Sequence, residues 1–332
     1  MILLALSCTR PVALPDDTGE ETDSGLELPV DGDGDGYPRW DQASDPALAD
    51  CDDHDPEVTP ATERLVSEGP FIRGEEISEW NLLEDTEPIR EIWLSPYCAD
   101  VTEVTNEAFV RFMEAQRDAG MDNQDASGQP LFDFEDDDDS VPERILEGRP
   151  YTISSGYEQH PVTEVWVWSG QAYCASLGKR LPTEAEWEKA ARGDQDERTW
   201  PWGEGEPDCE RANIRPGPEG ADGPEPCVDD TVVVGSYVGA SSPYGLVDMA
   251  GNVGEWVSDW YQPDYYAWCP DTDPPGPDDG WVELPDGGVM ETRVTRGGSF
   301  ASSLESTTVG ARYLEPAEAT SNGVGFRCVR PL

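Results

Sequence analysis

The stretch that follows Gly193 most limits what this chain can fold into, because no 3.6-residue period of apolar residues persists there. It contains instead short aromatic strands separated by turns. The whole sequence carries 33 glycines, 30 prolines and 12 tryptophans, which favours a loop-rich fold held by large aromatic side chains over a helical bundle. At 332 residues the chain can bury a sizeable core. We therefore predict an α+β fold rich in irregular structure.

Three helices are predicted before that stretch, each from local signals. The first follows Thr105, an expected N-cap, and places Phe109, Phe112 and Met113 on one face. A short strand is expected just before it, at 101–105. A second helix is predicted at about 167–177.

The third predicted helix has the clearest signal. Thr183 followed by Glu186 forms a T-x-x-E capping box, in which each residue satisfies a backbone N–H of the other. Acidic residues fill the first turn and basic residues the last, as the helix dipole favours, and Gly193 ends the helix.

The charge of the chain excludes some partners. Lys and Arg number 21 against 71 Asp and Glu, for a formal net charge of −50. Such a surface repels nucleic acid and anionic lipid headgroups and attracts divalent cations. We therefore expect no nucleic-acid partner. Only Lys179 and Lys189 are lysines, which indicates a GC-rich genome or, alternatively, a salt-adapted secreted protein.

The N-terminal residues 1–8 read M-I-L-L-A-L-S-C, and Cys8 follows small and aliphatic residues as in a bacterial lipoprotein signal. A lipid on Cys8 would anchor the protein, and the membrane would be contacted only through it. The alternative is a plain disordered N-terminus. Residues 9–30 are acidic and poor in aromatic residues, which predicts a disordered linker.

Residues 31–60 form an Asp-rich segment with two blocks, D-G-D-G-D-G-Y and D-C-D-D-H-D-P. Carboxylates this dense repel one another unless a cation lies among them. Calcium takes six to eight oxygen ligands, and glycine permits the tight turns between them. The alternative is a solvated acidic run, which we also expect for the separate run 136–139. The predicted calcium ligands are Asp31, Asp33, Asp35, Asp50, Asp52, Asp53 and Asp55. The segment resembles the calcium repeats of thrombospondin type 3.

Nine motifs stand in one order over about residues 69–332. They are F-I-R-G, T-E-V-T-N, H-P-V-T-E-V, A-Y-C-A-S-L-G-K-R-L-P-T-E-A-E-W-E, W-P-W-G, A-N-I, Y-G-L-V-D-M-A-G-N-V-G-E-W, R-G-G-S-F and G-F-R-C. In this order they resemble the formylglycine-generating enzyme family, also called the sulfatase-modifying-factor domain. The resemblance implies a variant of the C-type lectin fold that binds calcium.

The resemblance also implies particular calcium ligands. Asp248 and Glu255 would supply carboxylate oxygens, and Gly251 and Val253 backbone carbonyls, all hard donors that suit calcium. The alternative is a turn in which Glu255 is ion-paired. A second calcium site would begin at Asn213 and Ile214. The segment that should supply its other ligands departs from the family pattern, but Asp222, Asp229 and Asp230 are available there as ligands.

The eight cysteines include no CxxC pair, and dispersed cysteines indicate disulfides in an oxidising compartment. The resemblance implies a Cys174–Cys328 disulfide, and Cys209 and Cys227 flank one loop and are expected to pair. Partners for Cys51, Cys98 and Cys269 stay unassigned.

The oxidases of this family convert a cysteine to formylglycine with copper held by two cysteines after the G-G-S-aromatic motif. Here Ser302 and Thr307 stand at those positions, and no cysteine occurs between Cys269 and Cys328. Soft Cu(I) requires thiolates, so we expect no copper site and no confident catalytic residue. Two histidines are also too few for the iron site of other relatives. Ser299, Phe300 and Arg312 would form the wall of a binding groove.

We therefore predict a calcium-stabilised binding module for a peptide, protein or glycan, in the bacterial cell envelope or secreted, and anchored by lipid. The alternative is an active formylglycine-generating oxidase or another metal-dependent oxidoreductase of the family. The sequence predicts no oligomeric state.

Overall fold

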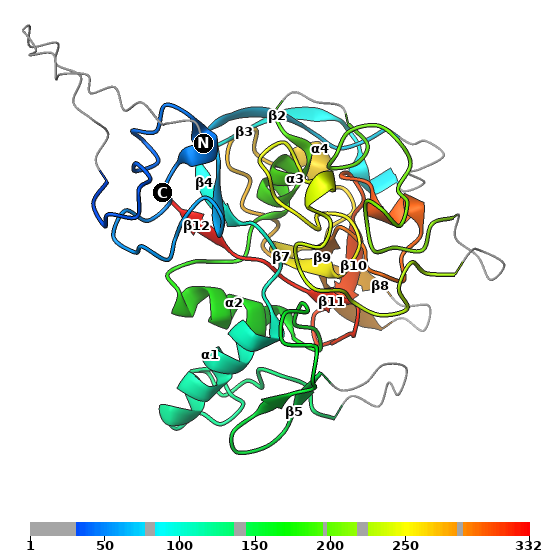
Figure 1. Ribbon diagram of the computed structural model, residues 1–332. Helices are drawn as coiled ribbons and strands as arrows, with labels where there is room; N and C mark the ends of the chain where they lie inside the picture. The colour runs from blue at the N-terminus through cyan, green and yellow to red at the C-terminus, as the bar shows by residue number, and fades with distance from the viewer. Residues whose placement is uncertain (1–30, 77–83, 136–143, 195–197, 218–224, 284–287) are drawn as a thin grey trace, which may run out of the picture.

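The computed structural model describes residues 31–76, 84–135, 144–194, 198–217, 225–283 and 288–332, and Figure 1 shows their arrangement. The predicted signal at 1–8 with Cys8, the linker 9–30, the acidic run 136–139 and Asp222 lie outside the described residues. None of the helices described is long and apolar enough to cross a bilayer.

The described strands form two larger sheets and two small hairpins, joined by long irregular connections. In the first sheet β4 lies between β1 and β12, both antiparallel to it. In the second sheet the order is β10-β9-β7-β11, and β8 also pairs with β9. Here β11 runs parallel to β7. The bounds of the first sheet are β1 Glu63–Val66, β4 Tyr97–Asp100 and β12 Val329–Pro331. Those of the second are β7 Gly254–Trp260, β8 Trp281–Glu283, β9 Val289–Arg296, β10 Tyr313–Pro316 and β11 Val324–Gly325. The hairpins are β2 Gly69–Arg73 with β3 Arg90–Leu94, and β5 Ile145–Leu146 with β6 Thr152–Ile153.

Helices α1 and α3 begin where the capping signals predict them, and α2 lies at the predicted residues without a side-chain cap. The hydroxyl of Thr105 accepts the Ala108 N–H at the start of α1. Thr183 and Glu186 make both bonds of the capping box at the start of α3. The α-helices are α1 Asn106–Asp118, α2 Val167–Ser176, α3 Glu184–Arg192 and α4 Tyr265–Trp268. Single 3₁₀ turns lie at Pro46–Leu48, Glu84–Thr86, Val238–Ala240 and Leu304–Thr307. The architecture is therefore mixed α/β with much irregular structure, as the sequence predicts.

The strand predicted at 101–105 is wrong. The strand of this region is β4, which ends at Asp100, and residues 101–104 leave the sheet. The Val104 N–H binds the Phe326 carbonyl oxygen at 2.9 Å. The Glu103 side chain turns inward and accepts the Asn252 amide N–H. A buried carboxylate with a distant partner therefore sets the path of these residues, and no local pattern reports it.

Strand β7 separates two hydrophobic cores, because successive side chains of a strand face opposite sides. Val257 packs into the first core with residues of β2, β3, β9, α3 and α4. Trp256 packs into the second, with α1, α2 and Phe326. Figure 1 shows α1 and α2 on one side of β7 and α3 and α4 on the other. The end of β9 pairs with β7, so the loop after β9 starts beside a strand that is packed on both sides.

Candidate functional site

The loop from Arg296 to Arg312 joins β9 to β10 and begins with two glycines. Gly297 and Gly298 have φ of 87° and 68°, in the left-handed region that favours glycine. A Cβ on Gly297 would lie 3.1 Å from the Trp187 ring and 3.3 Å from the Met249 carbonyl oxygen. The glycine pair therefore lets the loop pass close to α3, where a larger residue would have to displace its neighbours.

The hydroxyls at the expected copper positions are used inside the loop. Ser302 Oγ accepts the Ser299 N–H at 2.8 Å, and Thr307 Oγ1 donates to the Leu304 carbonyl at 3.0 Å. A Cβ on Gly298 would lie 3.0 Å from Thr307 Cγ2 and 3.1 Å from Ser302 Cβ, so the two side chains border one small space. Neutral hydroxyls are poor ligands for Cu(I), and the residues present do not fit copper.

The three residues expected to line a groove lie at different depths. Ser299 is half-buried, Phe300 is 6% exposed and Arg312 is fully enclosed. The Phe300 N–H binds the Asn252 carbonyl oxygen at 3.0 Å, which fixes the loop to the turn after Asp248. Ser299 is therefore the one of the three whose side chain is partly open to a ligand, and Arg312 supports the loop from below.

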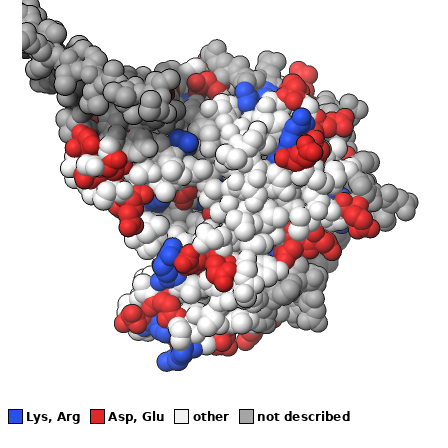
Figure 2. Space-filling view, viewed as in Figure 1, with Lys and Arg blue, Asp and Glu red and all other residues white. Residues whose placement is uncertain are grey.

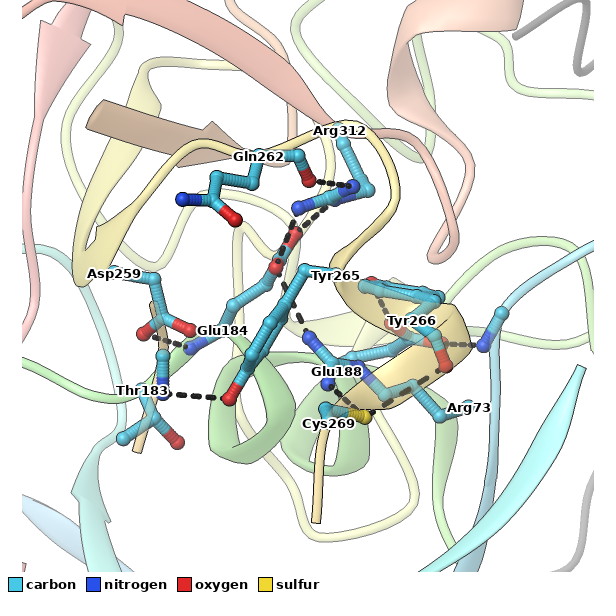
Figure 3. A network of polar contacts seen from close by, with 12 residues as sticks. Arg73, Thr183, Glu184, Glu188, Asp259, Gln262, Tyr265, Tyr266, Cys269 and Arg312 are labelled. Atoms are coloured by element: carbon cyan, nitrogen blue, oxygen red, sulfur yellow. Dashed lines mark hydrogen bonds and ion pairs between the residues drawn. The ribbon is translucent and has the colours of Figure 1, made fainter. Parts of the chain in front are cut away.

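Arg312 belongs to a cluster of buried charges beneath the loop (Figure 3). Glu184, at the start of α3, accepts N–H groups from Arg312 at 2.6 and 3.1 Å, from Arg296 at 3.1 Å and from Arg73 at 3.0 Å. Although burial raises it, these three guanidinium groups lower the pKa of Glu184 to about 2. Glu188, one turn later, accepts a further N–H of Arg296 at 3.0 Å. Fully paired charges of this kind fix geometry strongly.

The same arginines hold the far end of the loop. Arg296 donates to the carbonyl oxygens of Val309 at 2.7 Å and Gly310 at 3.2 Å. Arg312 donates to the Asp85 carbonyl oxygen at 2.8 Å. Both ends of the loop are therefore clamped to α3, and the loop is a preorganised surface.

Asp259 on β7 lies beside the N-terminus of α3 (Figure 3). Its Oδ2 accepts the Glu184 backbone N–H at 2.9 Å and the Ser258 hydroxyl at 3.2 Å. Its Oδ1 is buried and has no hydrogen-bond partner among the described residues. Burial and then the charge of Glu184 raise the pKa of Asp259 to about 7. The core thus holds a carboxyl group that titrates near neutral pH.

A second acidic cluster surrounds Asp248 in the D-M-A-G-N-V-G-E turn. Asp248 Oδ2 accepts the Gly235 N–H at 2.5 Å, and its Oδ1 is buried without a partner among the described residues. Glu103, which our sequence analysis did not single out, has one oxygen on the Asn252 amide at 2.9 Å and the other without a partner. Burial and then the charge of Asp248 raise the pKa of Glu103 well above its usual range. The signal available in the sequence was an acidic residue between Thr102 and Val104 in T-E-V-T-N, in a stretch otherwise free of charge.

The other predicted ligands of this region differ in whether their oxygens already have hydrogen-bond partners. Glu255 accepts two N–H groups of Arg327, each at 2.7 Å, and the Trp187 indole N–H at 2.8 Å. Asn213 Oδ1 is buried without a partner in the described part of the chain. Its carbonyl oxygen accepts the Asn252 N–H at 2.8 Å, which brings the Asn213 segment against the Asp248 turn. Gly251, Val253 and Ile214 are buried in the same region.

Three of the seven aspartates predicted in the Asp-rich segment come together, and two more lie in the segment that packs against them. Carboxylate oxygens of Asp31, Asp33 and Asp35 lie within 4.8 Å of one another. Asp53 Oδ1 accepts the Gly32 N–H at 2.6 Å. Asp50 is fully buried, and burial followed by the charges of Asp35, Asp33 and Asp53 raises its pKa to about 6.

The remaining two aspartates face elsewhere. Asp52 pairs with Arg330 on β12 at 2.8 Å. Asp55 is exposed, and its side chain accepts the Glu57 N–H at 3.1 Å. These two are therefore poorly placed to bind the same cation as the other five.

Three disulfides are present: Cys174–Cys328, Cys209–Cys227 and Cys51–Cys98. The first two are the pairs named from the sequence, and the third settles two of the unassigned cysteines. Cys269 is a buried free thiol, and its Sγ lies 3.3 Å from Arg90 Nη1 and 3.5 Å from Arg73 Nη1.

One arginine next to the loop, Arg215, has no acidic partner among the described residues. The Arg215 N–H binds the Ser302 carbonyl oxygen at 2.9 Å. Its half-buried side chain makes no hydrogen bond or ion pair with any described residue, and its Nε is buried. Within the described part of this acidic chain, Arg215 therefore offers a guanidinium to a ligand.

Comparison with known proteins gives consistent results. Residues 52–332 match the model of the sulfatase-modifying factor enzyme 1-like domain. The serine/threonine-protein kinase pkn1 of Chlamydia caviae is 34% identical over 269 residues, which cover 80% of this chain and 37% of that protein. The chain thus spans little more than a third of the length of this relative. The formylglycine-generating enzyme of Streptomyces coelicolor is 32% identical over 290 residues, covering 78% of this chain and 86% of that enzyme. The structure of PvdO from Pseudomonas aeruginosa has the same fold, with a TM-score of 0.56 at 22% identity over 81% of this chain and 94% of that one.

Proposed function

Because the chain belongs to the sulfatase-modifying factor enzyme 1-like domain family, we propose that it is a member without copper oxidase activity, a calcium-stabilised binding module of the cell envelope. The observation that carries the proposal is the loop between β9 and β10. Ser302 and Thr307 stand there where copper would need two cysteines. We propose no kinase activity, since the chain spans only 37% of the relative that is named a kinase.

A shifted alignment does not restore the copper ligands. No cysteine occurs between Cys269 and Cys328. Cys328 is bound to Cys174 in the second core, and Cys269 is buried against arginine side chains in the first core. Two thiolates cannot meet at the loop without unfolding one of the cores, so the Cu(I) chemistry of the family's oxidases has no ligands here.

The loop is better suited to binding. It is clamped at both ends by Arg296 and Arg312, so little conformational entropy is lost when a ligand docks on it. Ser299 offers a partly exposed hydroxyl in the loop, and Arg215 offers a guanidinium that pairs with no carboxylate of the described residues. These groups favour a peptide, protein or glycan that carries an acidic group. On the face in Figure 2 acidic side chains gather around the margin while the centre is mostly uncharged, which disfavours nucleic acid.

Calcium is the cofactor that the donor set fits. Asp248, Glu103 and Asn213 each have a buried oxygen without a partner among the described residues. Hard oxygen donors on neighbouring turns are what calcium binds, with carbonyls such as those of Gly251 and Val253 completing the shell. Glu255 has both oxygens on Arg327 and can join the shell only by sharing them. A bound ion would neutralise the repulsion between Asp248 and Glu103 and hold the turn next to Phe300.

The location and the fold subtype complete the proposal. Three disulfides suit an oxidising compartment, and a lipid on Cys8 would tether the protein through the acidic linker to a bacterial membrane or leave a secreted form after cleavage. The short strands around long loops suit the C-type-lectin-like variant fold that the resemblance implies.

A Cu(I) titration of the purified oxidised protein tests the proposal. With a colorimetric Cu(I) chelator as competitor, we expect the chelator to keep all the copper. A C-x-P-x-R peptide incubated with the protein, Cu(I) and oxygen should form no formylglycine aldehyde, as measured by mass spectrometry. Stoichiometric copper retained by the protein, or oxygen-dependent formation of the peptide aldehyde, would favour the oxidase instead.

A further inference from the structure

Four consecutive residues, 50–53, connect the acidic cluster to the globular domain. Asp50 and Asp53 face the loop 31–37, while Cys51 and Asp52 face the sheet β1-β4-β12. Whatever holds the first two residues in place therefore also positions the second two.

On the cation side, the cluster has oxygens that nothing in the described chain satisfies. Asp50 is fully buried, and its Oδ2 has no hydrogen-bond partner among the described residues. The same holds for one oxygen each of Asp33 and Asp35. A buried unpartnered carboxylate is costly on its own, and one aimed at other carboxylates more so. A divalent cation removes both costs at once.

The loop 31–37 has no room for a side chain at its contact with Asp53. A Cβ on Gly32 would lie 2.6 Å from Asp53 Oδ2 and 2.7 Å from the Asp53 carbonyl oxygen. The backbone of the loop thus lies directly on the 50–53 segment. Such close approach places Asp53 directly against the loop that carries Asp31, Asp33 and Asp35.

On the domain side, Cys51 is bonded to Cys98 of β4, and both sulfurs are buried. A small hydrophobic core covers them, and Trp40, Ala43 and Ala49 supply one side of it. These three residues lie between the two halves of the acidic cluster in the sequence. An open cluster would therefore release the cover of the disulfide.

A chain of ion pairs continues from Asp52 into the sheet. Arg330 bridges Asp52 at 2.8 Å and Glu63 at 3.0 Å, and Lys179 bridges Glu63 and Asp100, each at 2.6 Å. The segment is therefore fastened to β1, β4 and β12 by side chains as well as by the disulfide.

We infer that Asp31, Asp33, Asp35, Asp50 and Asp53 bind one calcium ion, and that this ion closes residues 36–49 over the Cys51–Cys98 disulfide and protects it from reduction. The inference rests on the calcium binding proposed above and adds a second, separate site with a redox consequence. Reduction by dithiothreitol converts the disulfide to two thiols while the reagent becomes its cyclic disulfide, and the attacking thiolate must first reach a sulfur. If the opening of the segment limits access, calcium at about 100 times its Kd lowers the open population, and with it the reduction rate, about 100-fold.

The test uses the full oxidised chain with calcium chloride or EDTA. Calcium stoichiometry is measured by isothermal titration calorimetry, and disulfide reduction is followed by alkylation and peptide mass mapping in dithiothreitol. We expect calcium to slow reduction of Cys51–Cys98. Cys209–Cys227 is the internal control, because any effect of calcium on its reduction should be the same in wild type and in Asp50→Asn. Asp50→Asn should lose one calcium ion or bind it at least about tenfold more weakly, because losing even an outer-sphere partner of a metal costs about tenfold or more in affinity. In this variant calcium should no longer slow reduction of Cys51–Cys98.

Asp55→Asn is the matched control, because Asp55 is exposed and outside the cluster; it should behave as wild type. Asp33→Asn, on the loop, replaces Asp50→Asn if the latter fails to fold. Equal reduction rates in calcium and EDTA, or calcium binding that neither variant weakens, would overturn the inference. If only Asp248→Asn loses a calcium ion, the inference fails but the proposed function stands. If the wild-type chain binds no calcium, both the inference and the proposed function lose their support.

Discussion

At the scale of single residues, positions 302 and 307 decide what the loop can do. Ser302 and Thr307 border the same space next to Gly298, so two cysteines there would place two thiolates together. We predict that the double variant Ser302→Cys/Thr307→Cys gains one Cu(I) site, because soft thiolates supply what hydroxyls cannot. Competition titration against a Cu(I) chelator measures the gain.

The single variant Ser302→Cys offers one thiolate and serves as the control, with copper binding close to that of wild type. A double variant that folds, stays reduced and still loses all copper to the chelator would show that these two positions do not correspond to the copper cysteines.

Asp259 is a residue-scale test of pH dependence. Its pKa is about 7 in the folded protein and near its ordinary value of 3.8 once unfolded. The folded state then holds a proton that the unfolded state has lost between those pH values, so stability falls as pH rises through this window. Asp259→Asn should remove that fall and be more stable than wild type at pH 8, by on the order of 4 kcal/mol. Melting temperatures at pH 5 and 8 measure it.

Asp264→Asn is a suitable control, since Asp264 is exposed and its side chain makes no cap hydrogen bond at α4. Its melting curves should follow wild type at both pH values. Parallel behaviour of wild type and Asp259→Asn would contradict the assignment.

At the scale of elements, helix α3 is held by contacts between sequence neighbours and by contacts with residues more than 100 positions away. Its capping box is made by Thr183 and Glu186, three residues apart. Its buried Glu184 holds Arg312, 128 positions away, and Arg296, 112 positions away. The helix is therefore both a locally stable element and the support of the loop.

We predict that Glu184→Gln costs far more stability than Thr183→Ala. Loss of one member of a buried charge cluster leaves arginines without a counter-charge and costs about 3–5 kcal/mol. Loss of an N-cap costs about 1 kcal/mol. Urea unfolding of both variants measures the difference, and a cap variant as unstable as the Glu184 variant would show that the cluster is not essential.

The sequence predicted what short-range patterns encode. The caps of α1 and α3 and the buried face with Phe109 and Phe112 appear as expected. Glu103 was missed, and the strand at 101–105 was misplaced, because the partner of Glu103 is Asn252, 149 positions away. The pairing of Cys51 with Cys98 likewise depends on how an acidic segment packs against a sheet, which no periodicity records.

At the scale of the whole molecule, two of the disulfides should contribute unequally. Cys174–Cys328 spans 154 positions and Cys209–Cys227 spans 18. The loop-closure model gives about 5 kcal/mol for the first and about 3 kcal/mol for the second. Replacing each pair by alanine and measuring the urea midpoint tests the order, with the shorter pair as the reference. A larger loss from the Cys209–Cys227 pair would mean that chain entropy does not dominate.

The last described residues of the chain also complete its interior. Phe326 belongs to the core with α1 and α2, Val329 to the core with α3, and Arg327 holds Glu255. A nascent chain leaving the ribosome therefore cannot close either core until this segment clears the exit tunnel. Until that point both cores stay accessible to chaperones and proteases, and a translational stall just before Phe326 would leave both cores open.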